Sequence, residues 1–477
     1  MSKPRSLLLA LWALGAGCTA GRDYEPPKTP VSDSFEQAGT ASGTTEDPVV
    51  VQWWKQFEDP ILDRLIDRAI AGNRDVRTAT ALLRETRALY DLEKFDLVPT
   101  LTAAGGYTRE LESSAVLPGI PRNARTFGFW NAGFDASWEF DLFGRIQRLT
   151  EAAAAEVGAS EASRRDVLVT LLAEVARNYF EYRGLRYQLD VARRNLVNQE
   201  ESLKFVTSRF DAGRGTELDV SRARAELQST RALIPPIETD ALRAKNRVAV
   251  LLGEAPTRFV LETPPPAPLG KLPPLIAIGR PEELLRRRPD IRQAERSLAA
   301  ATARIGVATA DLFPRLSFSG TFGPQSQTVP GLFHAGSAAY AFGPTLTWAA
   351  LDLGRVESRI RAADAHADAE LSRYEQTVLL ALEDTENALF TVGRTRERRD
   401  ALVEAVASSE RAAALADARY QGGAVDYLAL LDAQRTVLSF QLQLSESQTS
   451  TVTAFIALYK ALGGGWQYAP EPRAQGQ

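Results

Sequence analysis

Few side chains of this chain could carry covalent or metal chemistry. The 477 residues include one cysteine, Cys18, and two histidines, His334 and His366. One thiol and two isolated histidines cannot supply the ligands of a zinc site or the partners of a cysteine nucleophile. No glycine-rich phosphate loop accompanies them. The sequence therefore predicts no enzyme and no bound metal or cofactor, and it leaves modification of Cys18 as the one reaction to consider.

Cys18 stands at the end of an N-terminal targeting signal. Lys3 and Arg5 precede an apolar run at 7–14, and three small residues come directly before the thiol. This order is typical of a bacterial secretory signal. A cysteine at its end resembles a lipoprotein box, which implies a covalent lipid such as palmitate on Cys18, and Thr19 after it implies sorting to the outer membrane. The alternative is an ordinary signal peptide with a chance cysteine.

The overall composition excludes several other classes of protein. A formal net charge of −4 argues against a nucleic-acid binder. Beyond the N-terminal signal, no run of about 18 apolar residues exists that could form a membrane-spanning helix. We therefore do not expect a helical membrane protein.

The sequence is an internal duplication, with landmarks that recur about 210 residues further along. In each copy an alternating, aromatic segment passes through Asp-Leu and a Gly-Arg step into a long Ala-rich and charged stretch, which predicts a strand that hands over directly to a helix. The junction residues are Asp141, Gly144 and Arg145 in the first copy and Asp352, Gly354 and Arg355 in the second.

This repeat predicts the organisation of the chain. We expect a signal peptide at 1–17, a lipidated tether at 18–50, a first repeat at 51–252, a proline-rich linker at 253–285, a second repeat at 286–462 and a polar tail at 463–477. Each repeat should contain one β-hairpin, at about 99–140 and about 314–350, followed by a long helix pair, at about 141–252 and about 351–462. Asp59 and Pro60 should open the first helix as N-cap and first helical residue.

The hairpins have the pattern of membrane strands. From Trp130 to Phe140, aromatic and small apolar residues alternate with polar ones. Trp130 and Trp138 lie roughly 26 Å apart along a strand, which is comparable with the apolar band of a membrane barrel and its aromatic girdles. The alternative is a small soluble sheet packed on helices. Pro344 should mark a bend or an unpaired position in the last strand.

The helices predict rods rather than a compact bundle. The stretch from Gly144 to about Asp211 contains no proline and would extend about 100 Å as one helix. Gly213 and Gly423 should take positive φ values where the two rods turn back, and Thr216 and Asp426 should cap the returning helices. Residues 235–236, two prolines, should kink or break the first returning helix.

Four strands cannot close a barrel in lipid, because every unpaired edge amide would cost several kcal/mol. The chain should therefore assemble through its strands. A dimer would give eight strands, which fill their own interior, and a trimer twelve, so a conduit favours the trimer.

Several motifs together resemble the TolC-like outer-membrane efflux proteins, and in particular the lipoprotein branch resembling OprM. They are Trp53-Trp54 with Phe57 and Asp59-Pro60, Arg286-Arg-Arg-Pro289-Asp290-Ile291, Leu351-Asp352-Leu-Gly354-Arg355, and the segment from Arg419-Tyr420 to Asp432-Ala433-Gln434. The resemblance covers nearly the whole mature chain. It implies an α+β membrane protein whose two hairpins contribute to a homotrimeric, 12-stranded outer-membrane β-barrel, continued by a long α-helical barrel in the periplasm.

The resemblance also implies partners and a gate. The partners would be a periplasmic adaptor (membrane fusion) protein and an inner-membrane pump of the RND type, and the cargo would be drugs or other toxic solutes. Tyr420 and Asp219 align with positions that link neighbouring helices at the closed tip, and Asp432 aligns with an acidic ring. Asp426 is a further candidate, since three copies would surround one axis, but it could equally be only a helix cap.

Two other functions remain open at this point. A conduit for type I protein secretion would have the same fold and tip. A helical periplasmic scaffold without a transport role would explain the rods but not the alternating strands. The location expected from the signal and the strands is the outer membrane, with a lipid anchor and an extension into the periplasm.

Overall fold

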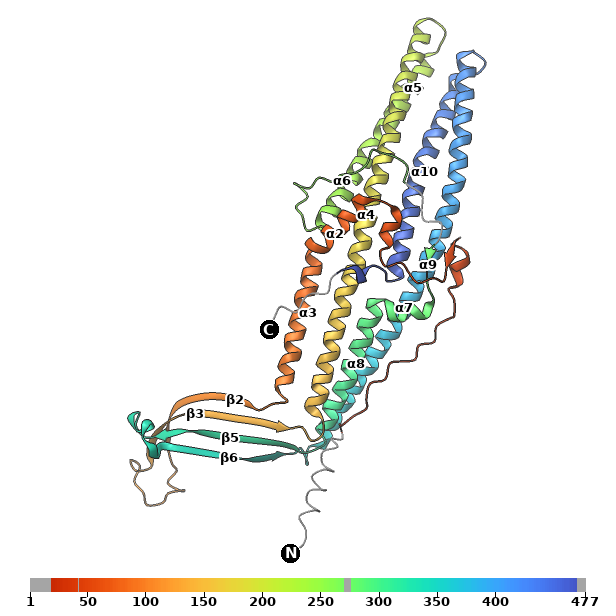
Figure 1. Ribbon diagram of the computed structural model, residues 1–477. Coiled ribbons are helices and arrows are strands. Elements are labelled where there is room, and N and C mark those ends of the chain that lie inside the picture. Colours follow the sequence, from red (N-terminus) through yellow and green to blue (C-terminus); the bar gives the residue numbers. More distant parts are fainter. Residues whose placement is uncertain (1–18, 42, 270–275, 470–477) are drawn as a thin grey trace. The chain divides into compact units, whose positions relative to one another are not determined.

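The computed structural model describes residues 19–41, 43–269 and 276–469 (Figure 1). The chain forms two compact units, and each unit draws segments from both halves of the duplicated sequence. Unit 1 comprises residues 1–28, 82–161 and 293–375, and unit 2 comprises residues 29–81, 162–292 and 376–477, as far as they are described. The two halves of the duplication therefore interleave, and neither half forms a body of its own.

Unit 1 contains a four-stranded antiparallel sheet with the strand order β2-β3-β5-β6. Its strands are β2 (Thr100–Leu111), β3 (Thr126–Phe140), β5 (Arg315–Ser326) and β6 (Ala338–Thr347). Both predicted hairpins are present, and the two halves meet where β3 pairs with β5, for example at Phe134 and Phe322. The four strands lie side by side in Figure 1. Within the described residues, β2 and β6 form the two edges.

Four helices supply the remainder of unit 1: the ends of α3 (Arg74–Phe95) and α8 (Pro289–Ala310) and the beginnings of α4 (Arg145–Asp211) and α9 (Leu353–Gln421). Small residues let these helices approach closely. Ala155 of α4 packs with Ala299 and Ala300 of α8, and Ala367 of α9 packs with Ala301 and Ile305. Short 3-10 helices, η3 (Pro330–Phe333) and η4 (Ala335–Ser337), connect β5 to β6.

Unit 2 is mainly helical. Its elements, besides parts of α3, α4, α8 and α9, are η1 (Glu36–Gly39), η2 (Trp53–Phe57), α2 (Pro60–Gly72), α5 (Glu217–Ala232), α6 (Ile234–Leu251), α7 (Pro281–Arg287), α10 (Tyr427–Ala461) and η5 (Trp466–Tyr468). The short strands β1 (Thr44–Thr45) and β4 (Ile276–Ala277) pair in parallel. Asp59 caps α2 and Pro60 is its first residue, as the sequence predicts.

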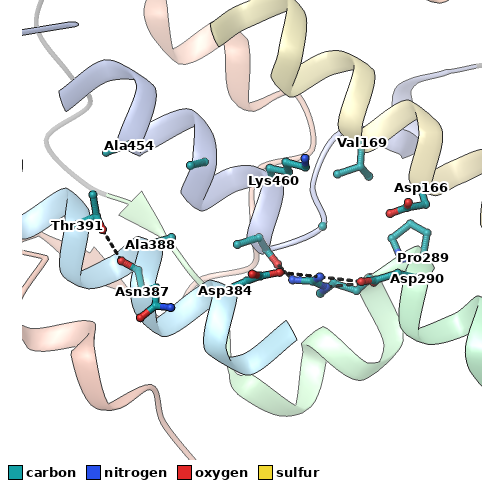
Figure 2. A pocket seen from close by; sticks show the side chains of 14 residues that line it. Asp166, Val169, Pro289, Asp290, Asp384, Asn387, Ala388, Thr391, Ala454 and Lys460 are labelled. Atoms are coloured by element: carbon teal, nitrogen blue, oxygen red, sulfur yellow. Dashed lines mark hydrogen bonds and ion pairs between the residues drawn. The ribbon is translucent and has the colours of Figure 1, made fainter. Parts of the chain in front are cut away.

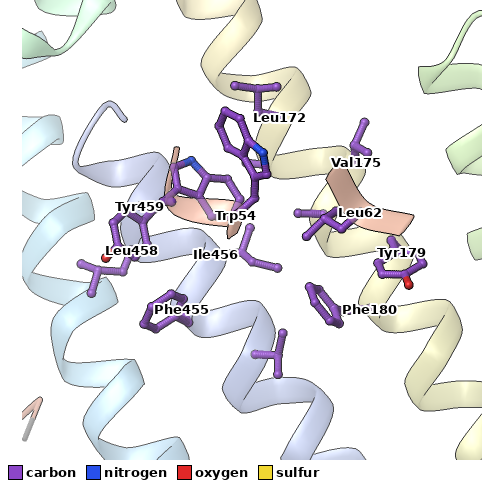
Figure 3. Packing of buried hydrophobic residues seen from close by; sticks show 14 of the residues in the cluster. Trp54, Leu62, Leu172, Val175, Tyr179, Phe180, Phe455, Ile456, Leu458 and Tyr459 are labelled. Atoms are coloured by element: carbon purple, nitrogen blue, oxygen red, sulfur yellow. The ribbon is translucent and has the colours of Figure 1, made fainter. Parts of the chain in front are cut away.

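The core of unit 2 is an aromatic cluster (Figure 3). Trp53 stacks on Tyr459 with ring centroids 5.7 Å apart, and Phe57 lies 4.7 Å from Phe180. Leu62 of α2 and Leu172 of α4 are fully buried beside them. The cluster joins η2, α2, α4 and α10, because packing together removes the apolar stripes of these helices from water.

Two segments expected to be a tether and a tail are packed in the structure. Phe35 and Ala41 are buried in unit 2, and the Glu386 carboxylate accepts hydrogen bonds from the backbone N–H groups of Glu36 and Gln37, both 2.9 Å long. At the other end, the Trp466 indole donates to the Arg287 carbonyl at 3.2 Å. A few large side chains suffice to dock these segments although their composition is mostly polar.

The prolines of α6 and of β6 act in two different ways, and only the first matches the expectation from the sequence. Helix α5 ends at Ala232 and α6 begins at Ile234, so Pro235 and Pro236 lie in the first turn of a new helix. Pro344 lies within β6 opposite Phe318, and the pairing with β5 continues through it without an unpaired residue. The proline removes one N–H from the strand but does not interrupt the register.

No helix among the described residues is long and apolar enough to cross a membrane. Likewise, the described part of the chain holds no group of three or more His, Cys, Asp or Glu residues arranged to bind a metal. The features that could serve a function are the helix tips, the strand-helix junctions, the faces of the sheet and a buried arginine.

Candidate functional site

The two helix tips of unit 2 have the same backbone construction. Gly213 and Gly423 have φ values of 71° and 73°, the left-handed conformation expected at these turns. In each tip the N–H of the third residue after the helix donates back to a carbonyl of the last helical turn, from Arg214 to Arg209 and from Ala424 to Arg419, both at 2.8 Å. These bonds satisfy carbonyls that would otherwise be free at the helix end. The duplication has therefore preserved the turn geometry as well as the sequence.

Two of the candidate gate carboxylates begin helices in their own chain. The Asp219 carboxylate accepts the Thr216 N–H at 3.3 Å, and the Asp219 N–H donates to the Thr216 hydroxyl at 3.2 Å, which forms a capping box at the start of α5. Asp426 accepts the N–H of Ala429 at 3.0 Å at the start of α10. Both carboxylates therefore have a local structural role, whatever else they do in an assembly.

Tyr420 lies in a small apolar core that joins the two tips. Tyr420 belongs to α9, and the other buried residues of this core come from α4, α5 and α10: Val206, Val220, Ala223, Tyr427, Leu430 and Leu431. The Arg209 guanidinium lies 4.8 Å from the centre of the Tyr420 ring and donates to the Tyr420 carbonyl at 3.3 Å. Burial raises the pKa of Tyr420, Arg209 opposes this rise, and Asp219 adds to it. The phenol therefore stays neutral and can act as a hydrogen-bond donor.

Asp432 lies apart from this cluster. It is exposed on α10, and its carbonyl accepts the Thr436 hydroxyl. A different ion pair links α5 and α10 nearby, from Arg435 Nε to Glu226 Oε2 at 2.5 Å, and Glu226 is buried. Sequence reasoning missed this pair, because the two residues lie in different halves of the chain and nothing in the local pattern relates them.

The two strand-helix junctions differ in detail. In the first, Gly144 has a φ of 73°, Asp141 accepts the N–H of Gln147 at 2.8 Å, and Arg145 forms two 2.8 Å hydrogen bonds with Glu139. Gly144 is thus needed for its backbone conformation. The second copy keeps the Gly-Arg motif, but its glycine has a different structural role.

In the second junction, Gly354 lies inside α9, which begins one residue earlier. Arg355 pairs there with Asp352 at 2.8 Å, within the first turn. A helical glycine needs no special conformation, so the two glycines are not equivalent.

A tryptophan fixes the foot of each hairpin in the same way. The Trp138 indole N–H donates to the carbonyl of Leu97 at 3.2 Å, and the Trp348 indole N–H donates to the carbonyl of Leu312 at 3.0 Å. The two acceptors follow α3 and α8, just before the first strand of each hairpin. Each hairpin is therefore bonded at its base to the loop that leads into it.

The register separates the sheet into an apolar and a polar face. Residues paired directly across neighbouring strands point to the same side. The apolar face includes Trp130, Phe134, Trp138, Phe140, Leu316, Phe318, Phe322, Tyr340, Phe342 and Leu346. The polar face includes Thr102, Asn131, Asp135, Ser137, Ser319, Thr321 and Thr345. In one chain the aromatic rows are exposed, with Phe322 61 % and Tyr340 72 % accessible.

Arg288 is the centre of a polar network that the sequence did not reveal. Its guanidinium binds the carboxylate of Asp290 through two nitrogens at 3.1 and 2.7 Å, reaches Asp384 at 3.3 Å and donates to the carbonyl of Ala461 at 2.9 Å. These partners join α8, α9 and the end of α10. The motif signalled an unusual arginine run, but only the structure shows that the third arginine is the buried one.

The same network borders a cavity of about 390 Å³ in unit 2 (Figure 2). Asp166 of α4 and Lys460 of α10 also line it. Burial raises the pKa of Asp166, and Asp290 adds to the rise, while Arg288 and Lys460 oppose it. The cavity is therefore bordered by opposing charges, and one of its carboxyl groups has a pKa above its ordinary value.

Comparison with known proteins agrees with this architecture. The family model for outer membrane efflux proteins matches residues 65–254 and 281–464. The chain is 35 % identical over 474 residues to outer membrane protein OprJ of Pseudomonas aeruginosa, covering 98 % of this chain and 97 % of that protein. It is 32 % identical to the toluene efflux pump outer membrane protein TtgI of Pseudomonas putida, with 96 % and 97 % covered.

Among solved structures, the outer-membrane channel OprN superimposes with a TM-score of 0.89 at 40 % identity, over 94 % of this chain and all of that one. The two-hairpin sheet, the paired tips and the helical body are thus the α+β fold of outer-membrane efflux channels. The matches extend along nearly the whole of both chains and carry the strands as well as the helices. The chain belongs to the outer membrane efflux protein family.

Proposed function

We propose that this chain is the outer-membrane conduit of a tripartite efflux system, in which small organic molecules pass from a periplasmic adaptor and an RND-type inner-membrane pump to the outside. The names of similar proteins from Pseudomonas putida support this cargo class, since they refer to solvents, toluene and antibiotics. The conduit itself is passive, and the partner pump supplies the energy. The sequence offers no phosphate-binding loop that would bind a nucleotide.

The observation that carries the proposal is the two-faced sheet with two free edges. Its apolar face suits lipid and its polar face suits a water-filled lumen. Within the described chain, β2 pairs only with β3 and β6 only with β5, so each has one unpaired edge, and unpaired edges are not tolerated in lipid. In the proposed homotrimer, β6 of each copy pairs with β2 of the next, and three four-stranded sheets close into one twelve-stranded barrel with an open interior.

A lipid anchor completes the proposal. Cys18 lies outside the described residues, and the proposal for it depends on the signal that precedes it. A single acyl chain anchors weakly, whereas several chains or a barrel anchor firmly. The lipid would therefore direct and orient the protein at the outer membrane rather than hold it there alone.

The helix tips are the proposed periplasmic gate. Tyr420 lies beside the start of α5, where Asp219 sits, and Asp426 starts α10. In a trimer each of these carboxylates, and Asp432, would occur three times around one axis, and such rings of negative charge favour cations. The apolar core around Tyr420 would hold the two helix tips of one copy together.

Single-channel conductance in planar bilayers tests the gate. We expect the double variant Tyr420→Phe with Asp219→Asn to raise conductance severalfold, because it removes the phenol donor and one ring of negative charges. Thr216→Ala is the matched control, since it breaks the capping box of α5 and keeps both gate residues. A conductance unchanged from wild type in the double variant would contradict the gate. An equal rise in the control would assign the effect to fraying of α5 instead.

A further inference from the structure

The first described residues, 19–24, are packed on the rest of unit 1 rather than free. The N–H of Ala20 donates to the carbonyl of Phe143 at 2.9 Å, and the carbonyl of Ala20 accepts the Nε–H of Arg148 at 3.1 Å. Both polar groups of this residue are thus bonded to the junction between β3 and α4. A residue held in this way has lost its backbone freedom, which a tether would keep.

Two of the three guanidinium nitrogens of Arg148 bind this segment. Besides Ala20, its guanidinium binds Asp23 at 2.6 Å and Glu151 at 2.7 Å, so that each of its three nitrogens has a partner. Only 5 % of its side chain is exposed. Burial lowers the pKa of Arg148, but the hydrogen bonds with Glu151 and Asp23 outweigh this effect and the pKa is raised overall. Without residues 19–24, a buried cation would lose two of its three partners.

Three glycines make room for the segment. A Cβ atom on Gly21, whose φ is 83°, would lie 2.6 Å from the Cα of Gly306 on α8. A Cβ atom on Gly306 would lie 2.9 Å from the Ala20 carbonyl oxygen, and one on Gly144 would lie 2.8 Å from Thr19. Real Cβ atoms do not approach so closely, so α8, the β3–α4 junction and the segment itself all need glycine here. This steric fit is independent of the bonds to Arg148.

The far end of the segment is fixed to α8. The Tyr24 hydroxyl donates to the Glu295 carboxylate at 2.7 Å, and the Arg296 guanidinium lies 5.7 Å from the Tyr24 ring centre. Burial and the bond to Glu295 raise the pKa of Tyr24, so the hydroxyl keeps its proton and remains a donor. Residues 19–24 are therefore held at both ends and in the middle.

From these contacts we propose that residues 19–24 form a clasp, locked by Arg148, which holds the lipid-bearing end of the chain at the foot of β3. The inference rests on the proposed lipidation of Cys18. Consecutive Cα atoms are about 3.8 Å apart, and Thr19 touches Gly144, so acyl chains on the preceding residue enter the membrane beside the strand-helix junction. A free segment from residue 19 to residue 34 could instead extend about 50 Å.

Limited digestion with trypsin tests the clasp on the full-length protein in detergent. Arg22 is exposed within the clasp, and cleavage after it requires the clasp to open. We expect cleavage after Arg22 to be at least tenfold faster in Arg148→Ala and in Gly21→Val than in the wild type, as measured by mass spectrometry of the N-terminal peptide. Gly21→Val changes only the segment, so it remains informative if Arg148→Ala fails to fold.

Arg304→Ala is the matched control, because the ion pair of Arg304 with Glu156 also joins α8 to α4 but does not involve the clasp. Cleavage in the control should match the wild type. Equal cleavage rates in Gly21→Val and in the wild type would overturn the clasp. A rate in Arg304→Ala as high as in Arg148→Ala would overturn the role of Arg148, since general loosening of the two helices would then explain it.

The position of the lipid needs a second measurement. Cells grown with a diazirine-bearing palmitate allow the acyl chain to be cross-linked to the protein and the cross-linked peptide to be identified. We expect cross-links in the region of residues 126–150 in the wild type and a severalfold loss of them in Gly21→Val. An identical pattern in both would overturn the positioning of the lipid. Absence of any label on the protein would overturn the lipidation of Cys18 and therefore the proposed position of the lipid. The trypsin digestion would still test the clasp by itself.

Discussion

Asp59 provides the sharpest test of how unit 2 is held together. One carboxylate oxygen accepts the N–H groups of Ile61 and Leu62 at 3.0 and 3.3 Å and so caps α2. The other accepts the Tyr179 hydroxyl at 2.8 Å and the Arg183 guanidinium at 2.6 Å, both from α4. The carboxylate is 10 % exposed. A single side chain thus begins one helix and joins it to another.

Substitutions of Asp59 can separate its role as a helix cap from its bonds to α4. Loss of the cap costs about 1 kcal/mol, and loss of the charged bond to Arg183, with a buried hydroxyl left unpaired, costs about 2 kcal/mol more. Asp59→Ala should therefore lower the free energy of local opening by about 3 kcal/mol. Asp59→Asn keeps an oxygen for the cap and should lose only the second part, about 2 kcal/mol.

Amide hydrogen exchange of α2, followed by mass spectrometry in detergent, measures this opening. Since 1.4 kcal/mol corresponds to a factor of ten, exchange should be roughly a hundredfold faster in Asp59→Ala and about thirtyfold faster in Asp59→Asn. Arg183→Met, which spares the cap, should resemble the Asn variant. Equal exchange in the Ala and Asn variants would refute the role of the cap, and wild-type exchange in Asp59→Ala would refute the account altogether.

Two further predictions concern the buried carboxyl group and the sheet. Since the pKa of Asp166 is raised in the folded protein, the folded state keeps this proton to higher pH than the unfolded state, and stability is lost as the pH rises through that range. Asp166→Asn should remove this loss. Thermal unfolding should therefore show the variant more stable than wild type at neutral pH and similar to it in acid, and the exposed control Asp240→Asn should show no such trend. A Cβ atom on Gly133 would lie 2.5 Å from the Phe322 carbonyl oxygen, so Gly133→Val should prevent β3 from pairing with β5 and reduce the yield of protein in the outer-membrane fraction to a small part of the wild-type amount. Gly343→Val, where nothing lies within 4 Å in one chain, is the control, and equal yields for the two variants would contradict the close approach.

Local patterns in the sequence predicted much of the fold. Alternation from Trp130 to Phe140 identifies a strand because side chains alternate across a sheet. Gly213 and Gly423 identify the turns, because few residues other than glycine adopt positive φ at a helix end. Asp59 with Pro60 identifies a helix start. Each of these signals lies within a few residues of the feature it describes.

Contacts between distant segments were not predictable in this way. The polar, glycine-rich residues after Cys18 suggested a tether, and nothing near them points to Arg148, more than a hundred residues further on. Similarly, three consecutive arginines at 286–288 do not reveal that Arg288 alone reaches the end of α10. The candidate gate carboxylates were chosen for a role between copies, and the single chain shows how Asp219 and Asp426 also serve their own helices.

The interruption at Leu233 makes the two helical segments that return from the tips mechanically different. The first arm is α5 followed by α6. The second arm is α10, a single helix of 35 residues whose backbone hydrogen bonds run without a break. In the first arm, the N–H of Leu233 bonds back to Thr230, and two prolines follow that have no N–H to offer. The first of these helix segments therefore has fewer backbone hydrogen bonds at this point than α10 and should bend there more easily. The first arm has a point of bending at Leu233, and the second is a continuous helix.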